Sequence, residues 1–396
     1  MWSRTYGGPG DEEPRSLIAT PDGGYVIAGF TGSVNSVSGR DFWLVKTDAP
    51  GNIQWNKTFG GAGNDMASSV VATSDGGYAI AGSWNYSRTY EFNNYIGGDF
   101  WLIKTDGLGN VQWNRTYGGA GSDMASSLVA SSDGGYAIAG TWNYSSYYGL
   151  GYTGDFWLVK TDALGNMEWN RTYVSGSVES LVATVDGGYA IAGFAPPLGG
   201  VLLVKTDALG NMQWSQTYDG GGWWESVSLV STSDGGYALA SFTLVLEPNN
   251  TTEAFWLAKT DSSGNIQWSK IYGGGVFDIA YSLVAASDGG YAVGASRSGD
   301  FWLIKTDAVG NTLWNRTYGG TGTEVAYSLI VTSDGGYAIA GWTDSFGAGG
   351  EDFWLVKTDG TGVVPEFSSW LIPSVLLLAT TLIVVKKKTL FHKRSK

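Results

Sequence analysis

The sequence of 396 residues contains no cysteine and a single histidine, His392, which lies in a basic run near the C-terminal end. The lack of cysteine excludes disulfide scaffolds, iron–sulfur clusters, thiol catalysis and zinc fingers, because their ligands or nucleophiles are missing. A Ser-His-Asp triad would depend on His392 alone. Proline is scarce as well, with 9 residues, so the 61 glycines do not belong to a collagen-like repeat.

Charged residues make up only 15% of the chain, and the formal net charge is −13. A disordered chain would carry more charge and fewer large apolar side chains. Here the aromatic residues reach 14%, with 19 Trp, 22 Tyr and 15 Phe. Glycine and aromatic residues in these amounts indicate many short strands joined by tight turns.

Seven internal repeats organise residues 1 to about 360. The first motif, Asp-Gly-Gly-Tyr, occurs seven times, and its tyrosines are Tyr25, Tyr78, Tyr136, Tyr189, Tyr237, Tyr291 and Tyr337. A second motif, Phe-Trp-Leu-Val/Ile-Lys-Thr-Asp, occurs in five copies and two variants, and a third, Gly-Asn-x-x-Trp, occurs in six internal copies. A fixed order of motifs at spacings near 50 residues indicates a repeat architecture.

Each repeat divides into four strand-like runs, which in the second repeat are 68–73, 78–82, 100–105 and 111–117. The Asp-Gly-Gly sequence at 75–77 supplies the positive φ angles that a tight hairpin needs. Four strands in about 50 residues is the size of a β-propeller blade. Small residues in the first two runs and bulky ones in the last two suit blades that converge at an axis and splay outward.

The two ends of the repeat region complement one another. The final repeat stops after Asp359 without its Gly-Asn-x-x-Trp strand, and the segment 2–8 looks like that missing strand. We therefore predict an all-β, seven-bladed β-propeller of four-stranded blades over residues 1–362, closed by the N-terminal strand. The alternative is an open solenoid of the same units, which would leave two unpaired strand edges.

The repeats resemble the secreted bacterial and archaeal β-propeller repeats that are labelled SBBP-type. The resemblance rests on the order Ser-Leu-Val-Ala, Asp-Gly-Gly-Tyr-Ala-Ile-Ala-Gly, Asp-Phe-Trp-Leu-Val-Lys-Thr-Asp and Gly-Asn-x-x-Trp, and it covers residues 1 to about 360. It implies a propeller fold and an extracellular location. It implies no assigned catalytic site.

The composition changes after Gly362. Residues 367–385 form an uncharged, largely apolar run, and residues 386–396 contain six Lys or Arg residues. About 20 apolar residues span a bilayer as a helix, and flanking basic residues stay in the cytoplasm. We therefore predict a transmembrane helix over 367–385, a cytoplasmic tail over 386–396 and a propeller on the outer surface of the cell. A buried core helix is the alternative.

The predicted linker 363–366 and the start of the apolar run contain Pro365, Glu366 and Phe367. Followed by an apolar span and a basic cluster, this tripeptide resembles the PEF-type C-terminal sorting signal of archaeal surface proteins. The resemblance implies an archaeosortase-like membrane protease as a partner that processes the tail. An ordinary single-span anchor is the alternative, and both interpretations place the propeller outside.

An exported propeller needs an N-terminal signal, but Met1 and Trp2 begin inside a repeat, without a charged n-region or an apolar h-region. We expect that the start codon is misassigned or that the sequence is a fragment. Residues 1–365 carry 17 basic and 35 acidic side chains, a net charge of −18. Such a surface would repel nucleic-acid phosphates, so no nucleic-acid partner is expected.

Asn-x-Ser/Thr sequons occur eight times and identify candidate glycosylation sites. Several belong to the repeated Trp-Asn-Arg-Thr sequence, so duplication accounts for part of their number. Three lie in variable loops, where a glycan has room, and these predicted glycosylation sites are Asn85, Asn143 and Asn250.

The loops between the second and third strands are long in repeats two and three, at 83–98 and 141–154, and both are rich in aromatic residues. Exposed aromatic side chains suit the flat apolar faces of sugars or a protein partner. The other interpretation, which we favour, is that they pack on one another and hold the long loops in place. The candidate ligand-binding residues are Trp84, Tyr86, Tyr90, Tyr95, Trp142, Tyr144, Tyr148 and Tyr152.

Acidic residues recur five positions before the central apolar residue of the first strand in five repeats, and Gly176 and Trp224 stand there in repeats four and five. A partial acidic ring would offer Ca²⁺ its oxygen ligands, and a carboxylate pair would serve a glycosidase. We favour a structural interpretation, in which each acid accepts backbone N–H groups of its Gly-rich loop. The residues are Glu12, Asp65, Asp123, Asp278 and Glu324.

The sequence therefore predicts a surface-anchored β-propeller that acts as a non-catalytic binding, adhesion or structural module of an archaeal-type cell envelope. Its ligand would be a glycan or a surface protein, and no cofactor other than Ca²⁺ is considered. The competing hypothesis is an extracellular, glycosidase-like enzyme that uses carboxylates. Because an active site needs a unique group, such an enzyme should depart from the repeat in its central pocket.

Overall fold

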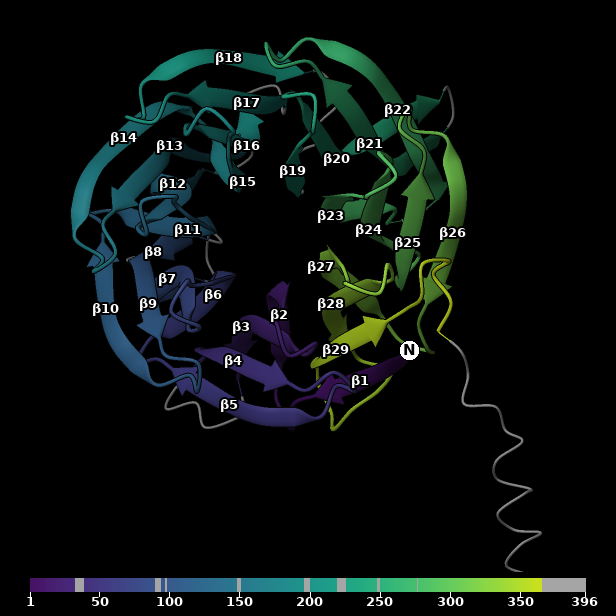
Figure 1. Ribbon diagram of the computed structural model, residues 1–396, viewed down its shortest axis with the longest axis horizontal. Helices are drawn as coiled ribbons and strands as arrows, with labels where there is room; N and C mark the ends of the chain where they lie inside the picture. The colour runs from purple at the N-terminus through teal and green to yellow at the C-terminus, as the bar shows by residue number, and fades with distance from the viewer. Residues whose placement is uncertain are drawn as a thin grey trace, which may run out of the picture.

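The computed structural model describes residues 1–32, 39–89, 94–96, 98–147, 151–195, 200–218, 226–247, 250–275 and 277–364, without the side chains of 87–89, 94–96, 145–147, 151–153, 195, 246–247 and 250. These residues form a ring of seven antiparallel sheets around a central axis (Figure 1). The predicted all-β fold with seven four-stranded blades is confirmed. Blade two carries one additional short strand, β8 (Asn94–Ile96), paired with its second strand.

The two inner strands of each blade contain the small residues of the repeat. The innermost strands, which line the axis, are β2 (Glu12–Ala19), β6 (Asn64–Ala72), β11 (Ser122–Ala130), β15 (Ser177–Ala183), β19 (Val227–Ser231), β23 (Ile279–Ala285) and β27 (Glu324–Val331). The second strands, which start at the tyrosine of Asp-Gly-Gly-Tyr, are β3 (Tyr25–Thr31), β7 (Tyr78–Thr89), β12 (Tyr136–Tyr147), β16 (Tyr189–Ala195), β20 (Tyr237–Glu247), β24 (Tyr291–Arg297) and β28 (Tyr337–Thr343).

The two outer strands contain the bulky residues. The third strands, buried on both faces by neighbouring blades, are β4 (Asp41–Thr47), β9 (Asp99–Thr105), β13 (Gly151–Thr161), β17 (Gly200–Thr206), β21 (Asn250–Thr260), β25 (Asp300–Thr306) and β29 (Asp352–Lys357). The outermost strands are β5 (Ile53–Phe59), β10 (Val111–Tyr117), β14 (Met167–Ser175), β18 (Met212–Tyr218), β22 (Ile266–Gly275), β26 (Thr312–Tyr318) and β1 (Trp2–Tyr6).

The N-terminal strand closes the ring, as the sequence predicts. β1 pairs with β29 in the last blade, with Trp2 opposite Lys357. The indole Nε1 of Trp2 donates a hydrogen bond of 3.1 Å to the carbonyl of Ala49, and its ring meets Tyr25 edge-on at 5.9 Å. The first and last blades are thereby joined, which rules out the open solenoid.

Aromatic side chains of the third strands fill the spaces between blades. Phe42 of blade one lies 4.8 Å from Trp101 of blade two, measured between ring centroids. The equivalent pair of blades two and three, Phe100 and Trp157, lies at 4.5 Å. Both phenylalanines are fully buried. This packing holds the blades at a fixed distance from the axis and so sets the frame of the central channel.

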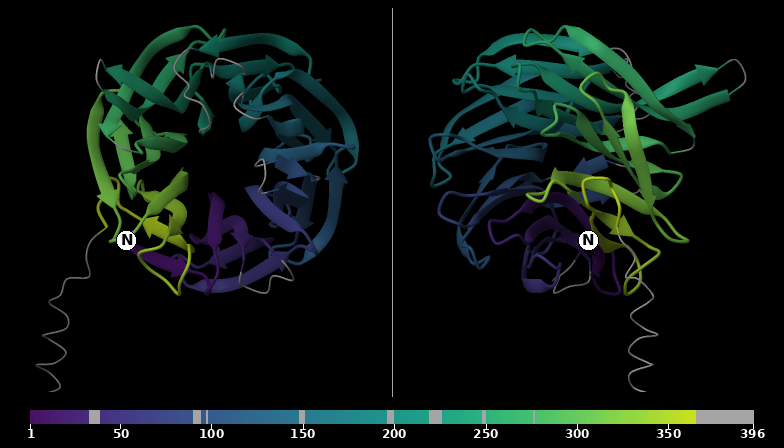
Figure 2. Two further views of the ribbon diagram at one scale, coloured as in Figure 1. Left: turned by 180° about the vertical axis from the view of Figure 1, so that it is seen from behind. Right: turned by 45° about the vertical axis from the view of Figure 1, so that its right-hand side comes forward.

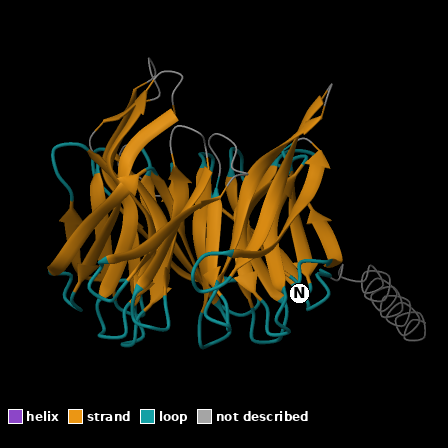
Figure 3. Ribbon diagram, turned by 90° about the horizontal axis from the view of Figure 1, so that it is seen from above, coloured by secondary structure: helices purple, strands orange, loops and turns teal. Residues whose placement is uncertain are grey.

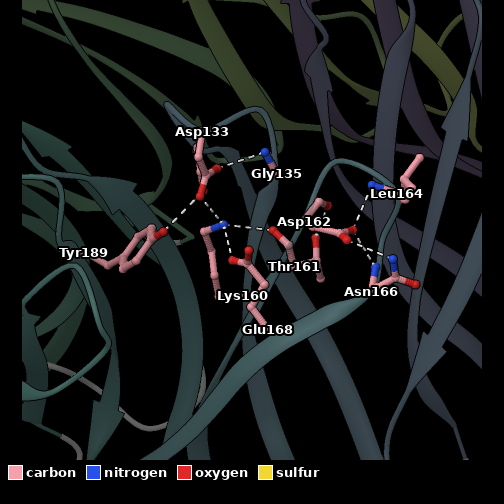
Figure 4. A network of polar contacts seen from close by, with 10 residues as sticks. Asp133, Gly135, Lys160, Thr161, Asp162, Leu164, Asn166, Glu168 and Tyr189 are labelled. Carbon is pink, nitrogen blue, oxygen red and sulfur yellow. Dashed lines mark hydrogen bonds and ion pairs between the residues drawn. The ribbon is translucent and has the colours of Figure 1, made fainter.

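The short turns between first and second strands, and between third and fourth strands, lie on one face of the ring, the turn face (Figure 3). Here each blade buries a lysine of its third strand. In blade three, Lys160 Nζ lies 2.7 Å from Asp133 Oδ2 and 2.9 Å from Glu168 Oε2, and it donates to the carbonyl of Thr161 (Figure 4). The Lys–Asp bridge occurs in all seven blades.

The connections between blades and the loops between second and third strands lie on the opposite face, the loop face (Figure 3). The hairpin of β20 and β21 projects from this face in the right-hand view of Figure 2. The added strand β8 lies against β12, so the long hairpins of blades two and three are neighbours.

Within the described ranges of the chain, no helix is long and apolar enough to cross a membrane. The predicted transmembrane helix at 367–385, the tail at 386–396 and the sorting motif Pro365, Glu366 and Phe367 lie outside those residues. The anchor and the sorting signal therefore stay predictions from the sequence.

Candidate functional site

A β-bulge in six of the seven innermost strands turns one side chain of each toward the central channel. In β2 the register with β3 shifts between Pro14 and Ser16, and β6, β11, β15, β23 and β27 show the equivalent shift. A bulge leaves one residue unpaired and re-aims its side chain. β19 pairs with β20 without a shift. The bulge residues are Arg15, Ser68, Ser126, Glu179, Tyr281 and Tyr327.

At five of the seven junctions between blades, a repeated serine of the innermost strand links the two blades. Ser16 Oγ accepts the backbone N–H of Val70 at 3.1 Å, and Ser328 Oγ accepts that of Leu17 at 3.1 Å, which joins the last blade to the first. The same hydrogen bond joins blades four to five, five to six and six to seven. These bonds fix the channel wall whatever side chain occupies the bulge.

The channel contains a cavity of about 590 Å³. Its wall includes the seven repeated serines, the six bulge residues, and Thr141 and Tyr144 from the second strand of blade three. Ligand pockets commonly measure roughly 300–1,000 Å³ and combine apolar faces with a few polar groups. The channel therefore has the size and the chemistry of a binding site for a small ligand.

Arg15 is the one cationic side chain that lines this cavity among the described residues. Its Nη2 lies 2.5 Å from Glu13 Oε2, and its guanidinium stacks over the ring of Tyr327 at 4.1 Å. Tyr281 meets Tyr327 edge-on at 5.2 Å. The Arg15 side chain is 32% exposed, so the guanidinium reaches the channel while Glu13 balances its charge.

Glu179 lies in blade four, across the channel from blade one. Its Oε1 accepts a hydrogen bond of 3.4 Å from Ser177 Oγ. Burial in the channel wall raises the pKa of Glu179 from 4.5 to about 7, against the lowering effects of Ser177 and of the Arg15 charge. The carboxyl therefore exchanges its proton near neutral pH, a property typical of functional sites.

A second shifted carboxyl lies near Glu13, where blades seven and one meet. Burial and the negative charges of Glu13 and Asp11 raise the pKa of Glu351 to about 7, while the Arg40 charge lowers it. The ion pair of Arg15 and Glu13 is thus flanked by a carboxyl that is protonated for part of the time at neutral pH.

None of the bulge residues is among the site residues predicted above, although the sequence contains a signal for them. The position before the repeated serine reads Arg, Ser, Ser, Glu, Val, Tyr and Tyr along the seven repeats, while its C-terminal flank hardly changes. A position that varies inside an otherwise regular strand is a candidate for function. That it faces the channel follows only from the bulge, which the residue pattern does not reveal.

The two predicted tryptophans of the aromatic loops pack within their own blades. Trp84 meets Trp101 at 4.5 Å, and Trp142 meets Trp157 at 4.6 Å, each at a steep angle between ring planes. Each pair joins the start of a long loop to the third strand beside it. The contacts agree with the favoured interpretation, in which these aromatic residues hold the loops in place.

The predicted tyrosines of these loops divide into two groups. Tyr86 and Tyr144 are buried, and Tyr144 lines the channel cavity. For Tyr95 and Tyr152 only the backbone is described, and Tyr90 and Tyr148 lie outside the described residues. The structure thus brings one predicted ligand-binding residue into the cavity formed by the bulge residues.

The five predicted acidic residues lie at five separate blade junctions, and all are almost completely buried. Each accepts a backbone N–H from its Gly-rich loop at 2.8–3.0 Å, which the structural interpretation predicts. Within the described part of the chain, no group of three His, Cys, Asp or Glu side chains is placed to hold a metal ion. A Ca²⁺ site stays a prediction at Glu12, Asp65, Asp123, Asp278 and Glu324.

At four of these junctions a second carboxylate, from the third strand of the preceding blade, faces the acid. Burial and the negative charge of Glu12 raise the pKa of Asp352. A Cβ atom on Gly7 would lie 1.9 Å from Asp352 Oδ1 and 2.5 Å from Glu12 Oε2, so a larger residue does not fit there. The other pairs are Asp41 with Asp65, Asp99 with Asp123, and Asp300 with Glu324.

The predicted glycosylation sites Asn85 and Asn143 are exposed and have φ angles of 54° and 53°. Asn tolerates this left-handed conformation better than most residues. Their backbone N–H groups donate to Asp65 and Asp123, at 2.7 and 2.8 Å. Asn250 begins β21, and its side chain is outside the described set. Glycosylation itself stays a prediction.

No protein-family model matches the sequence, and none of the curated proteins matches it. The fold is similar to that of several solved structures. U3-55K shares 12% identity, with 90% of this chain and 98% of that chain covered and a TM-score of 0.56. The WD40 domain of Pan2 from Neurospora crassa shares 10% identity, with 91% and 92% covered and a TM-score of 0.55.

A third similar structure is the polysaccharide lyase Uly1, with 11% identity, 89% of this chain and 90% of that chain covered, and a TM-score of 0.53. Identities this low establish the fold alone. The chain is therefore a seven-bladed β-propeller with a polar central channel. The SBBP-type and PEF-type resemblances remain predictions from the sequence.

Proposed function

We propose that this propeller is a non-catalytic binding module of the cell surface and that a glycan binds in its central channel. One observation carries the proposal: in a scaffold that repeats seven times, the channel-facing bulge residues differ from blade to blade. Tyr281 and Tyr327 offer flat apolar faces with polar edges, and the repeated serines offer hydroxyl groups. A sugar needs both kinds of contact.

The glycan proposal is tested with the full chain, solubilised in a mild detergent, on an array of glycans. We expect binding to a subset of the array and a loss of affinity of about tenfold in Tyr327→Ala, which removes a stacking face. The matched control is Phe277→Ala, because Phe277 is an exposed aromatic residue in a connection on the loop face, outside the cavity. No binding on the array, or equal losses in both variants, would contradict the proposal.

The surface location rests on the sequence beyond the described residues. The apolar run 367–385 would anchor the chain, the basic residues 386–396 would stay inside, and an archaeosortase-like protease would process the tail near Pro365, Glu366 and Phe367. In intact cells, we expect added protease to digest the propeller and to spare an epitope tag fused after Lys396 in unprocessed chains. A propeller that resists protease until the cells are lysed would contradict this location.

A glycosidase-like enzyme is the second candidate, and the titration of Glu179 near neutral pH favours it, because a general acid needs such a pKa. The similarity to a polysaccharide lyase concerns the fold alone. Glycans that bind on the array are incubated with the full chain, and the products are followed by mass spectrometry. Cleavage that disappears in Glu179→Gln would establish the enzyme, and intact glycans would support the binding module.

A further inference from the structure

We propose that the ligand of the central channel carries a protonated amine and that the Glu179 carboxylate binds it. The ligand class is an amine-bearing glycoside of one or two sugar units. This inference rests on the proposed function, since it names the chemistry of the ligand in the same cavity. It follows from the charges that line the channel and from the groups that surround them.

The positive charge in the channel wall is already balanced. Glu13 Oε2 lies 2.5 Å from Arg15 Nη2, and the face of Tyr327 covers the guanidinium at 4.1 Å. An anionic ligand group at Arg15 would therefore meet Glu13 as well, and its attraction to the guanidinium would be offset by like-charge repulsion. The pair of Arg15 and Glu13 contributes hydrogen-bonding atoms to the site but little net charge.

The negative charge of Glu179 is not balanced in this way. Within the described part of the chain, its hydrogen-bond partner is the hydroxyl of Ser177, and no Lys or Arg nitrogen lies within ion-pair distance of it. Glu179 is half-buried in the cavity wall, so its carboxylate loses part of its hydration without gaining a cation. A ligand ammonium would supply the missing cation, and the net charge of −18 on residues 1–365 would attract it.

The wall around Glu179 suits the sugar part of such a ligand. The oxygens of Ser180, Ser228 and Ser282 accept backbone N–H groups of the next blade, so each of these hydroxyls keeps its own hydrogen to donate. Tyr281 and Tyr327 add flat faces. The cavity of about 590 Å³ leaves room for one or two sugar rings beside the amine.

Because the pKa of Glu179 is raised, the pH dependence of amine binding gives a second test of the proposal. Among the described residues, the charged and titratable groups that line the cavity with Glu179 are Arg15, Tyr144, Tyr281 and Tyr327. Arg15 and Tyr327 keep their protons between pH 5.5 and pH 8, because the pKa of each lies above its ordinary value, which for both is already about 10 or higher. Glu179 and Glu351, which lies near Glu13, both have pKa values of about 7, so a change of amine affinity over this range reports the ionisation of Glu179 only where Glu179→Gln removes it.

The experiment compares two glycosides by calorimetry with the full chain in detergent: 2-aminoethyl β-D-glucopyranoside and its neutral match, 2-hydroxyethyl β-D-glucopyranoside. At pH 8 we expect the amine to bind about tenfold more tightly than the alcohol, the effect of one charge-assisted hydrogen bond. At pH 5.5, where Glu179 is protonated, we expect the two affinities to differ by less than about twofold.

Three variants sharpen the test. Glu179→Gln removes the charge, and Glu179→Ser places at this bulge the residue that blades two and three already carry, so the scaffold accommodates it. Both should abolish the preference for the amine, measured in each variant as the ratio of the affinities for the two glycosides. Glu168→Gln is the matched control, because Glu168 lies on an outermost strand, outside the cavity, and it should keep the preference.

The outcomes separate the two proposals. Equal affinity of both glycosides at pH 8, with Tyr327→Ala weakening both, would overturn the amine and retain the glycan site. A preference that survives in Glu179→Gln and Glu179→Ser would overturn the role of Glu179. Failure of both glycosides and of every glycan on the array to bind would overturn the proposed function together with this inference.

Discussion

At the scale of the residue, the buried lysine of each third strand shows how the repeat accommodates a charge. Lys104 is almost completely buried, and Asp75 lies 2.7 Å from its Nζ with half of its side chain in solvent. Hydrogen bonds from Lys104 and Thr73 hold the pKa of Asp75 at about 2. Loss of the aspartate should therefore destabilise the fold more than loss of the lysine, because the lysine is buried and the aspartate is half in solvent.

The two ends of this ion pair should consequently differ in their effect on stability. Asp75→Asn leaves the buried ammonium of Lys104 with neutral partners, and we expect the free energy of unfolding to fall by about 3 kcal/mol. Lys104→Met leaves a carboxylate that water and Thr73 still solvate, and we expect a loss of about 1 kcal/mol or less. Denaturant titration of both variants measures the difference, and equal losses would contradict it.

At the scale of the element, β1 is the outermost strand of the last blade although it comes from the other end of the chain. Its pairing with β29 covers an edge that would otherwise present unpaired N–H and C=O groups. Trp2 fixes it through Ala49 and Tyr25 of blade one. Closure of the ring therefore depends on a few contacts of one short strand.

Loss of the Trp2 side chain should loosen this closure. We expect Trp2→Ala to lower the free energy of unfolding by about 3 kcal/mol and to promote association as β29 becomes accessible. Trp55→Ala is the matched control, because Trp55 packs on Tyr78 in the same manner in a strand whose blade is continuous in sequence. Denaturation and light scattering measure both effects. If Trp55→Ala associates as readily, closure is not the cause.

The junctions between blades contain a second element, the carboxylate pairs. Ionisation of Asp352 is opposed by burial and by Glu12, so its pKa lies above the ordinary value of 3.8. A raised pKa means that the folded state binds this proton more tightly, and stability falls as the pH rises through that pKa. Within the described part of the chain, Asp352 Oδ1 has no hydrogen-bond partner, whereas Oδ2 accepts the N–H of Ala348.

We therefore expect Asp352→Asn to stabilise the propeller at pH 7. The amide oxygen would keep the hydrogen bond from Ala348, and the amide N–H₂ would donate to Glu12 in place of a repelling charge. The gain should shrink toward pH 3, where the carboxyl of the parent protein is itself protonated. Melting temperatures at the two pH values check this, and a loss of stability at pH 7 would show that the charge of Asp352 is needed.

At the scale of the whole molecule, two sets of carboxyl groups act in opposite directions. Asp22, Asp75 and Asp234 have pKa values of about 2 because their lysines bind them, so their contribution is complete above pH 3.8 and is lost as the pH falls toward 2. Glu179 and Glu351 have pKa values of about 7 instead of 4.5, so their ionisation lowers stability as the pH rises from 4.5 to 7.

These opposing shifts predict a maximum of stability in mildly acidic solution, between about pH 4 and pH 6. Denaturation midpoints at pH 2.5, 5 and 8 measure the profile, and the value at pH 5 should be the highest. In the Glu179→Gln variant, the denaturation midpoint should fall less between pH 5 and pH 8 than in the parent protein. A midpoint that rises steadily up to pH 8 would show that the raised carboxyls do not govern the profile.

Much of the fold follows from local sequence, and much of the site does not. The turn at 75–77 specifies a hairpin by itself, and seven copies of such a turn specify seven blades. By contrast, Glu179 and Tyr281 look like ordinary strand residues until a bulge turns them inward. Packing of Trp84 and Trp142 is the favoured interpretation of the sequence, but their partners in the third strands, Trp101 and Trp157, follow only from the tertiary structure.

The number of blades, the closure by the N-terminal strand and the role of the Gly-rich turns all follow from the sequence. Each depends on short motifs that act within a few residues or repeat at a fixed period. The tertiary structure alone decided which side chains share the channel, which carboxylates face each other across blade junctions and which lysine each turn aspartate binds. These depend on the register of paired strands and on contacts between blades, such as Ser328 with Leu17, which lie 311 positions apart in the chain.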